Sequence, residues 1–354
     1  MTKKHNHYLD LAFHLAEKNL GRTKLNPTVG TVIVKNGSVI SSGVTSLQGR
    51  PHSEFNALNN LKNCRGATLY TTLEPCTHYG KTPPCTNIII KKKIKNVFYS
   101  FEDPDKRTFK KAKKILSQKG IKTKLIRSKK FSKFYKSYFT NKKLFIPYLT
   151  AKIAISKDYF TINKKEKWIT NKISRNKVHL LRSMHDCVLS TSKSINRDDS
   201  LLNCRINGLN NNKPDLFIID LKLNLRKKLS LKKYLQIRKT FLITNKNNIN
   251  KTLVYKKLGY KFIFINKLKD KNDFNLLFKK IYKKGYSRML IETGLTFLNT
   301  LIKNKIVHEL YIFKSDKKLG KNGKNNTSSG YLKSIRPKLL TINLNGDNLL
   351  KKEF

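Results

Sequence analysis

Apolar and polar residues follow two recurrent patterns along this chain. Apolar residues spaced three or four positions apart in residues 8–20 predict a helix, whereas short apolar runs such as residues 96–101 predict strands. The dipeptide Asn36-Gly37 between two short runs predicts a hairpin. Strand signals at residues 67–72 and 121–126 alternate with helix signals at residues 53–61 and 110–119. The first part of the chain therefore predicts an α/β domain with three layers.

The rest of the chain repeats this alternation. A basic stretch, residues 127–143, separates the two regions and ends near Pro147. A chain of 354 residues is long enough for two cores, and we expect domains over residues 1–146 and 147–354. A polar loop is expected over residues 321–330. Strands are expected over residues 148–155, 186–190, 216–220, 240–244, 261–265, 288–292 and 309–313.

Four residues between positions 52 and 85 have the composition of a catalytic zinc site. A catalytic zinc ion takes three protein ligands and keeps a fourth position for water. His52, Cys76 and Cys85 supply one nitrogen and two sulfurs, and the carboxylate of Glu54 lies two residues from a ligand. A carboxylate in that position is suited to carry protons as general acid and base. The pattern therefore predicts a zinc-dependent hydrolytic deaminase with one zinc ion per chain.

A proline precedes each of the two cysteines. Pro75 and Pro84 suit the first position of a helix, so we expect a helix at each cysteine, where its N-terminus stabilises a thiolate. A structural zinc site is the alternative, although such a site is usually closed by four ligands. The other cysteines are expected to be buried small hydrophobic residues. They are Cys64, Cys187 and Cys204.

The wide spacing of the two cysteines is unlike that of cytidine and tRNA deaminases, because eight residues separate them instead of two. The first half contains the segments Asn26-Pro-Thr-Val-Gly30, Pro51-His-Ser-Glu54 and Thr72-Leu-Glu-Pro-Cys-Thr-His-Tyr-Gly-Lys-Thr-Pro-Pro-Cys85. The second half contains Pro147-Tyr148, Trp168-Ile-Thr170, Leu180-Leu-Arg182, Asp198-Asp199 and Ile291-Glu-Thr-Gly294. In these segments the chain resembles the bifunctional riboflavin-biosynthesis deaminase-reductases, and the resemblance spans nearly the whole chain.

This resemblance implies a cytidine-deaminase-like domain of three layers, followed by a dihydrofolate-reductase-like α/β domain. It implies that the first domain deaminates a diaminopyrimidinone that carries a ribosylamino 5-phosphate. It also implies that the second domain reduces the ribosyl group to ribityl with NADPH. The sequence lacks the G-x-G-x-x-G motif of the classical dinucleotide fold, and the reductase fold implied here binds NADPH without it.

The same resemblance implies roles for individual residues. In the first domain, the pyrimidine substrate would contact Asn26, His78, Lys81 and Asp103. In the second domain, substrate contacts are expected at Lys152, Glu166, Arg182, Leu202, Arg205 and Glu292. NADPH contacts are expected at Ala154, Trp168, Ser194, Asp198 and Gly294.

The residues themselves support two of these assignments. A strand that runs into Thr293-Gly294 before a helix has the form of a phosphate site, but it would equally suit an ordinary turn. Arg182 and Arg205 have the chemistry of a phosphate clamp, although the chain has many solvated cations. Trp168, the single tryptophan, would also suit the apolar core.

Several positions depart from the pattern of that family. Tyr159 and Leu295 stand where the family has a glycine and a proline, Ser200 replaces a proline, and Thr45 replaces a histidine. At Glu166 the family commonly has a serine. The zinc ligands are unchanged, whereas most departures lie in the second half. A deaminase with an eroded reductase domain is therefore an alternative to the bifunctional enzyme.

Charge suggests a further alternative. The chain has 76 Lys and Arg against 21 Asp and Glu, a formal net charge of +55, which is typical of nucleic-acid binding. An RNA-binding protein with a structural zinc is thus an alternative from another class. The lysines are nevertheless spread along the chain without a basic stripe interleaved with aromatic residues. We therefore expect no specific nucleic-acid partner, and a charge that attracts phosphorylated substrates and NADPH.

Location and assembly are less constrained by the sequence. The polar first residues lack the form of a signal peptide, and no apolar run approaches the ~18 residues of a membrane span. We therefore expect a cytoplasmic protein without membrane association. A homo-oligomer is compatible with the sequence, which does not determine it.

Overall fold

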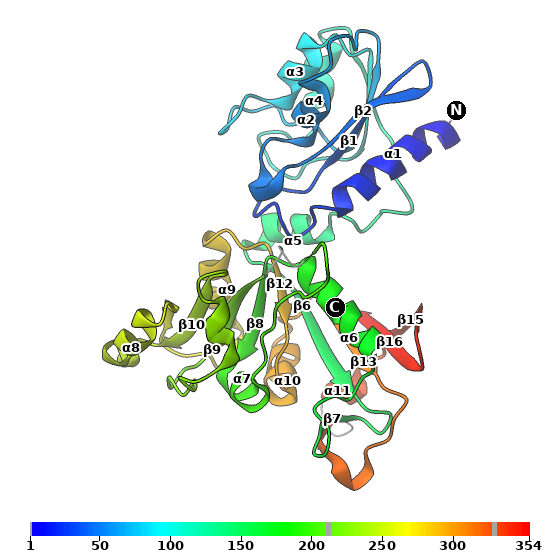
Figure 1. The fold of residues 1–354 in the computed structure, drawn as a ribbon. Coiled ribbons are helices and arrows are strands. Elements are labelled where there is room, and N and C mark those ends of the chain that lie inside the picture. The colour runs from blue at the N-terminus through cyan, green and yellow to red at the C-terminus, as the bar shows by residue number, and fades with distance from the viewer. Residues whose placement is uncertain (1, 210–213, 328–330) are drawn as a thin grey trace. The chain divides into compact units, whose positions relative to one another are not determined.

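The computed structural model describes residues 2–209, 214–327 and 331–354, which form two compact units (Figure 1). The units are Met1–Phe145 and Ile146–Phe354. Each has its own sheet and its own apolar core. The predicted α/β class is therefore confirmed in both units.

The first unit is built around a five-stranded mixed sheet. Its strands are β1 (Gly30–Lys35), β2 (Ser38–Val44), β3 (Thr68–Leu73), β4 (Asn96–Phe101) and β5 (Lys122–Leu125), in the order β2-β1-β3-β4-β5. β1 pairs antiparallel with β2 and β3, whereas β3, β4 and β5 run parallel. Both residues of the turn between β1 and β2, Asn36 and Gly37, have positive φ, so the predicted hairpin is confirmed.

Helices cover both faces of this sheet. They are α1 (Thr2–Glu17), α2 (Ser53–Leu58), α3 (Cys85–Lys91), α4 (Lys111–Ser117) and α5 (Lys136–Leu144). Because side chains alternate along a strand, Ile33 packs with α2, α3 and α4, whereas its neighbours Val32 and Val34 pack with α1. The result is the predicted arrangement of three layers.

The second unit contains a nine-stranded sheet in the order β11-β10-β9-β8-β12-β6-β13-β16-β15. The strands from β11 to β13 run parallel, and β16 and β15 are added antiparallel at one edge. β7 (Phe160–Asn163) and β14 (Gly323–Asn326) form a separate pair. The strands of the large sheet are β6 (Tyr148–Ile155), β8 (Cys187–Thr191), β9 (Asp215–Ile219), β10 (Thr240–Asn245), β11 (Lys261–Ile265), β12 (Arg288–Ile291), β13 (Glu309–Lys314), β15 (Lys338–Leu344) and β16 (Asp347–Glu353).

Two apolar clusters hold helices against this sheet. Leu189 and Ile291 pack on one side with α9 (Lys271–Lys283) and α10 (Leu295–Lys303). Their neighbours Val188 and Leu290 pack on the other side with α6 (Lys172–Ser183), α7 (Ser192–Asp198) and α8 (Thr252–Lys257). A short helix, α11 (Tyr331–Ser334), completes the unit.

One expectation for a loop is wrong, because the loop expected over residues 321–330 contains β14. Its last three residues, 328–330, lie outside the described residues. The basic stretch expected to connect the domains contains α5. The pair β15–β16 was not predicted, although its turn, Asn345-Gly346, is a hairpin dipeptide with positive φ at both residues.

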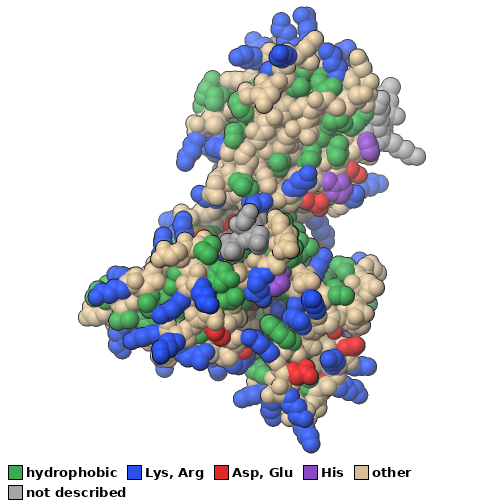
Figure 2. All heavy atoms as spheres, viewed as in Figure 1, with side chains coloured by type: hydrophobic (Ala, Val, Ile, Leu, Met, Phe, Trp, Pro, Cys, Tyr) green, Lys and Arg blue, Asp and Glu red, His purple; other side chains and the backbone are tan. Residues whose placement is uncertain are grey.

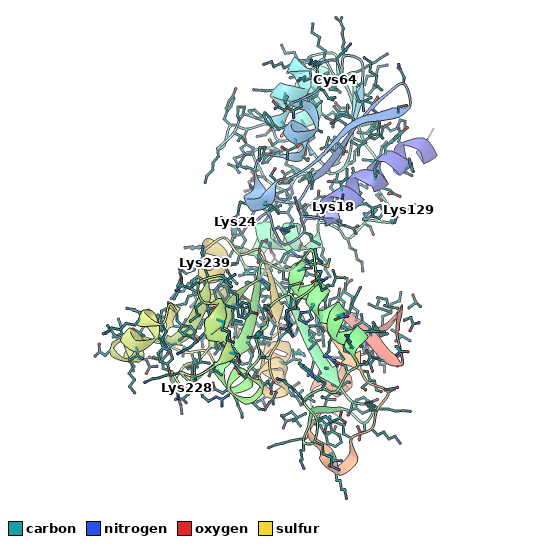
Figure 3. All side chains as sticks on the ribbon, viewed as in Figure 1. Lys18, Lys24, Cys64, Lys129, Lys228 and Lys239 are labelled. Carbon is teal, nitrogen blue, oxygen red and sulfur yellow. The ribbon has the colours of Figure 1, made fainter. Side chains whose placement is uncertain are left out.

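Basic side chains are dispersed over the surface. On the face shown in Figure 2, Lys and Arg occur over both units instead of gathering over one element. The labelled lysines of Figure 3, all exposed, belong to separate parts of the chain: Lys18, Lys24, Lys129, Lys228 and Lys239. Within the described residues, every helix is too short or too polar to cross a membrane.

Candidate functional site

His52, Cys76 and Cys85 come together in the first unit. Nδ1 of His52 lies 3.5 Å from Sγ of Cys76 and 3.4 Å from Sγ of Cys85. The ligand atoms of all three residues lie within 4.8 Å of one another. One nitrogen and two sulfurs at these separations fit a tetrahedral zinc ion, with bonds of about 2.0 and 2.3 Å, and leave one position open.

The three ligands come from three segments. His52 is the N-cap residue of α2, and Cys85 is the first residue of α3. Cys76 follows β3 in an irregular segment, so the helix predicted at this cysteine is wrong. The amide of Cys85 donates a hydrogen bond to Sγ of Cys76 at 3.2 Å. Cys76 is thus stabilised by the N-terminus of α3 without belonging to a helix.

The hydrogen bond from Cys85, supported by His52, lowers the pKa of Cys76, so Cys76 is the more acidic thiol of the pair. Metal binding needs deprotonated sulfur. The chemistry of this donor set therefore fits a zinc ion.

Glu54 lies beside the ligands in the first turn of α2 and is 4% exposed. Burial raises the pKa of Glu54, and the nearby charge of Cys76 raises it further. Its Oε2 accepts a hydrogen bond from the hydroxyl of Ser53 at 3.1 Å, and that hydroxyl lies 2.8 Å from the hydroxyl of Thr31. A buried carboxyl group whose pKa moves toward neutral pH is suited to accept and return a proton.

Three of the predicted pyrimidine contacts differ in how they are held. The side chain of Asn26 donates to the carbonyl of Gly49 at 2.9 Å. Nδ1 of His78 lies 3.2 Å from the hydroxyl of Thr108. Lys81 is exposed. The structure thus fixes the first two by hydrogen bonds and leaves the third at the surface.

The fourth contact, Asp103, is 7% exposed. It is supported by Tyr138 and Glu74, whose roles sequence reasoning missed. Tyr138 of α5 donates to Oδ1 of Asp103 at 3.1 Å. The carboxylate of Glu74 accepts from the amides of Asp103 at 3.2 Å, Lys110 at 3.1 Å and Ala112 at 3.1 Å. Glu74 therefore positions the segment that carries Asp103. The signal was a glutamate directly after an apolar strand, inside the zinc motif.

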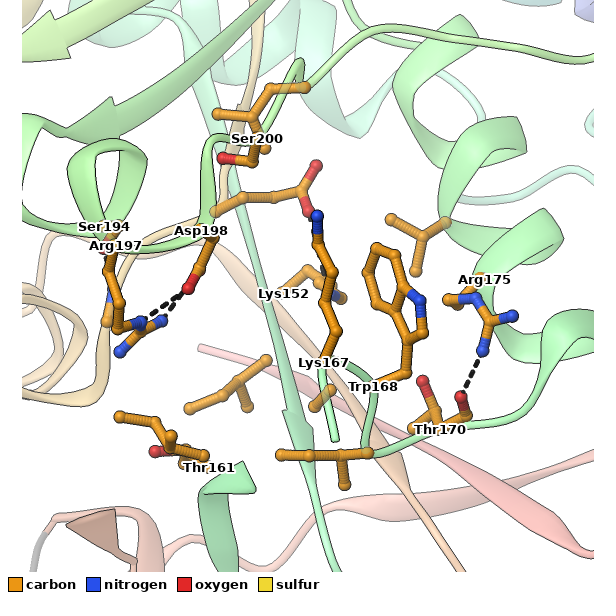
Figure 4. A pocket seen from close by; sticks show the side chains of 18 of the residues that line it. Lys152, Thr161, Lys167, Trp168, Thr170, Arg175, Ser194, Arg197, Asp198 and Ser200 are labelled. Atoms are coloured by element: carbon orange, nitrogen blue, oxygen red, sulfur yellow. Dashed lines mark hydrogen bonds and ion pairs between the residues drawn. The ribbon is translucent and has the colours of Figure 1, made fainter. Parts of the chain in front are cut away.

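The second unit contains a cavity of about 950 Å³. Side chains from β6, α6, α7 and the start of α10 line it, and Figure 4 shows part of this lining. All the residues predicted for the reductase lie in it. They are Lys152, Ala154, Glu166, Trp168, Arg182, Ser194, Asp198, Leu202, Arg205, Glu292 and Gly294.

A buried ion network forms one wall of this cavity. Arg182 donates to both oxygens of Glu292, at 2.6 and 2.9 Å, and Nζ of Lys152 lies 3.6 Å from Oε2 of Glu292. Although burial favours the protonated carboxyl, Arg182 and Lys152 lower the pKa of Glu292 to about 2. Glu292 is thus an anion that holds two cations in the wall.

A second wall joins two helix N-termini. The amide of Gly294, the N-cap residue of α10, donates to the hydroxyl of Ser194 in α7 at 3.2 Å. Thr293 beside it has a buried hydroxyl with no hydrogen-bond partner among the described residues. The N-terminus of α10, with the unpartnered hydroxyl of Thr293 beside it, fits a phosphate group of a dinucleotide.

Trp168 is 50% exposed, so the alternative that it belongs to the core is wrong. Its ring stands between two cations, with Cζ of Arg175 at 4.9 Å and Nζ of Lys167 at 5.5 Å from the centroid (Figure 4). Asp198 forms a bidentate ion pair with Arg197 at 2.6 and 2.8 Å. An exposed tryptophan at a basic cavity mouth suits a ligand with phosphates and aromatic rings.

Comparison with known proteins identifies the family. The model of the RibD C-terminal domain matches residues 147–349, and the model of the cytidine and deoxycytidylate deaminase zinc-binding region matches residues 2–101. The riboflavin biosynthesis protein RibD of Aquifex aeolicus is 32% identical over 321 residues, which are 88% of this chain and 87% of that protein. The chain belongs to the RibD family.

Two further similar proteins cover nearly the whole chain and two fifths of it, respectively. A solved diaminohydroxyphosphoribosylaminopyrimidine deaminase/5-amino-6-(5-phosphoribosylamino)uracil reductase of Thermotoga maritima has a TM-score of 0.85 and 26% identity, with 99% of both chains covered. A diaminohydroxyphosphoribosylamino-pyrimidine deaminase of Buchnera aphidicola is 39% identical over 142 residues, which are 40% of this chain and 97% of that protein. The predicted family, fold class and zinc-binding deaminase region are confirmed. The roles of single side chains stay predictions.

Two departures from the RibD pattern have a structural explanation. Thr45 is 1% exposed, and its hydroxyl accepts from the amide of Val29 at 2.9 Å, so it fills its position as a structural residue. Tyr159 keeps the left-handed backbone that glycine favours, with φ of 71°. Such a conformation costs about 1–2 kcal/mol for a residue with a side chain. A cation–π contact offsets part of this cost, because Nζ of Lys314 lies 4.2 Å from the centroid of the Tyr159 ring.

Proposed function

We propose that this chain catalyses two successive reactions of riboflavin biosynthesis. The first is the hydrolytic deamination of 2,5-diamino-6-ribosylamino-4(3H)-pyrimidinone 5′-phosphate, with zinc. The second is the reduction of the ribosyl side chain to ribityl with NADPH, which gives 5-amino-6-ribitylamino-uracil 5′-phosphate. One observation carries the proposal: a single RibD-family chain contains both three clustered candidate metal ligands beside buried Glu54 and a cavity lined by every residue expected of the reductase.

In the first unit, Glu54 moves the protons of the deamination. His52, Cys76 and Cys85 would hold a zinc ion, which would supply a water molecule whose pKa is lowered to about 7. Glu54 takes the proton of this water as the bond from its oxygen to the ring carbon forms. Glu54 then gives the proton to the amino group as the carbon–nitrogen bond breaks and ammonia leaves. The pKa of Glu54, raised by burial, suits both transfers.

In the second unit, the cavity wall binds and orients the reactants. NADPH supplies a hydride to C1′ of the ribosyl group, whose ring oxygen gains a proton as its bond to C1′ breaks. Arg182 and Arg205 line the cavity, and a guanidinium group is suited to bind the substrate phosphate. Trp168, Ser194 and Gly294 would hold the dinucleotide. Glu292 keeps Arg182 oriented through two hydrogen bonds.

A product analysis tests both activities. Purified protein is given the diaminopyrimidinone phosphate and zinc, with and without NADPH, and the products are identified by mass. The deaminated pyrimidine is expected without NADPH, and its ribityl form with NADPH. Deaminated product alone in both reactions would contradict the reductase proposal and favour the eroded-reductase alternative. No conversion, together with RNA binding that weakens steeply with salt, would favour the RNA-binding alternative.

The proposed reactions also predict where the protein acts and which partners it needs. A cytoplasmic enzyme that acts on a phosphorylated small molecule needs neither a membrane nor a nucleic-acid partner. The dispersed basic surface would attract the anionic substrate and NADPH, and this attraction should weaken as salt concentration rises.

A further inference from the structure

Two polar residues lie buried behind the reductase cavity. Asn203 is 1% exposed and Arg238 is 4% exposed. The described lining of the cavity contains Leu202 and Arg205 from the same segment, but neither of these two residues. Asn203 and Arg238 are therefore placed to act through the lining and not through contact with the substrate.

Asn203 joins two of the cations that line the cavity. Its backbone carbonyl accepts a hydrogen bond from Nη1 of Arg182 at 3.1 Å. Its side-chain oxygen Oδ1 accepts from Nη1 of Arg205 at 2.7 Å. One residue thus fixes two guanidinium groups, the first through its backbone and the second through its side chain.

Arg238 fixes the backbone that carries Asn203. Its Nη1 donates to the carbonyl of Leu202 at 2.9 Å and to that of Pro214 at 3.2 Å, and its Nη2 donates to the carbonyl of Leu201. Leu202 has a φ of 49°, in the left-handed region that disfavours leucine. The buried guanidinium therefore holds a strained turn in place directly before Asn203.

Electrostatics explain why such tethers are needed. Burial and the charge of Arg182 lower the pKa of both Arg205 and Arg238, the latter to about 10. Glu292 is the carboxylate that pairs with Arg182 and Lys152 in this wall. Like charges separate unless hydrogen bonds hold them, so neutral Asn203 keeps Arg205 near Arg182 without cancelling the charge that an anion would use.

We propose that Asn203 is a positioning residue that holds Arg205 at the separation from Arg182 at which both guanidinium groups reach one substrate phosphate, with Arg238 securing its backbone. The inference rests on the proposed reductase function. It adds that the distance between the two guanidinium groups of the phosphate clamp is fixed by Asn203, a residue outside the cavity lining. A substitution at position 203 removes only the hydrogen bond between the Asn203 side chain and Arg205, because the backbone carbonyl that accepts from Arg182 is present with any side chain.

A double-mutant cycle tests this proposal in the full-length, zinc-loaded protein. Asn203→Ala, Arg205→Ala and the double variant are assayed for NADPH oxidation with the deaminated, phosphorylated pyrimidine. Asn203→Ala is expected to raise KM for this substrate about tenfold in the wild-type background. In the Arg205→Ala background it should raise KM by less than about twofold, because the residue that it positions is gone. Inorganic phosphate should inhibit Asn203→Ala less strongly than wild type.

Two readouts separate positioning from general damage. KM for NADPH and ammonia release by the first unit should stay unchanged in Asn203→Ala. If that variant does not fold, Asn203→Ser, which is too short to reach Arg205 in the same way, takes its place in the cycle. Equal KM effects of the Asn203 substitution in both backgrounds would overturn the inference. A wild-type protein that oxidises no NADPH with this substrate would instead overturn the proposed reductase function.

Discussion

The guanidinium group of Arg182 donates hydrogen bonds to both carboxylate oxygens of Glu292, at 2.6 and 2.9 Å, and so joins α6 to the residue that follows β12. Nζ of Lys152 in β6 lies 3.6 Å from the same carboxylate. Glu292 is 9% exposed. A single buried anion thus holds two cations from different elements at the cavity wall.

Removing the charge of Glu292 should damage the reductase alone. In Glu292→Gln two buried cations lose their partner, which typically costs 3–5 kcal/mol. We expect the unfolding free energy of the second unit to fall by about that amount and NADPH oxidation to drop, with ammonia release unaffected. Glu353→Gln, a less buried change in the same unit, is the control and should behave as wild type. Normal NADPH oxidation by Glu292→Gln would contradict the role of the network.

The same residue predicts an acid-sensitive unit. The pKa of Glu292 is lowered from 4.5 to about 2, because Arg182 and Lys152 outweigh the effect of burial. A lowered pKa contributes stability that is complete above pH 4.5 and is lost as the pH falls toward 2. The loss is on the order of 3 kcal/mol. We would measure the free energy of unfolding of wild type and of Glu292→Gln across this pH range. The difference between the two values should shrink as the pH falls, and a constant difference would refute the role of Glu292 in acid sensitivity.

Glu54→Gln should separate metal binding from catalysis. Glutamine keeps the size of the side chain but cannot carry the proton, so ammonia release should fall by about 10²–10⁴-fold. Zinc content should stay at one ion per chain, since His52, Cys76 and Cys85 are untouched. Glu102→Gln serves as the control, because Glu102 is partly exposed and pairs with Arg127 at 3.5 Å. Full deamination by Glu54→Gln would instead indicate that the zinc is structural.

Gly43 sets how closely α2, with Glu54, lies on the sheet. A Cβ atom at Gly43 would lie 2.4 Å from the carbonyl oxygen of Ser53 and 2.6 Å from the amide nitrogen of Ala57. Gly43→Ala must therefore displace α2, at a cost of roughly 1–3 kcal/mol. We expect weaker zinc binding and slower ammonia release, measured by metal titration and by assay. Ser42→Ala, at the exposed neighbouring position, should change neither, and an unaffected Gly43→Ala would show that α2 can shift without harm.

Local patterns were enough to predict much of the fold. The strand signals at residues 96–101, 148–155 and 261–265 coincide with β4, β6 and β11, because consecutive β-branched and aromatic residues mark a buried strand. Local signals failed at Cys76. Its preceding proline suggested a helix start, but the stabilising amide comes from Cys85 in α3. That contact depends on how two segments meet, which spacing alone does not encode.

The candidate sites divide in the same way. The metal ligands and Glu54 were predicted because few residue types can serve there and their spacing is informative. Among 76 Lys and Arg, in contrast, nothing local distinguishes Arg238, which matters through carbonyls 24 to 37 positions away. Glu74 is a similar case, since its three amide partners lie beyond β4. Positioning residues become visible only when the chain is folded.

Trp168 provides a test of the cofactor side of the cavity. Because the side chain is half exposed and contacts Arg175 and Lys167, its removal should cost little stability. Loss of an aromatic surface for the dinucleotide should raise KM for NADPH by about tenfold, equivalent to about 1.4 kcal/mol. KM for the pyrimidine should change little, and ammonia release should not change. Ile173→Ala, an exposed position nearby in α6 that is outside the cavity lining, is the matched control. If Trp168→Ala raised KM for the pyrimidine and left KM for NADPH unchanged, the assignment of Trp168 to the NADPH side of the cavity would be wrong.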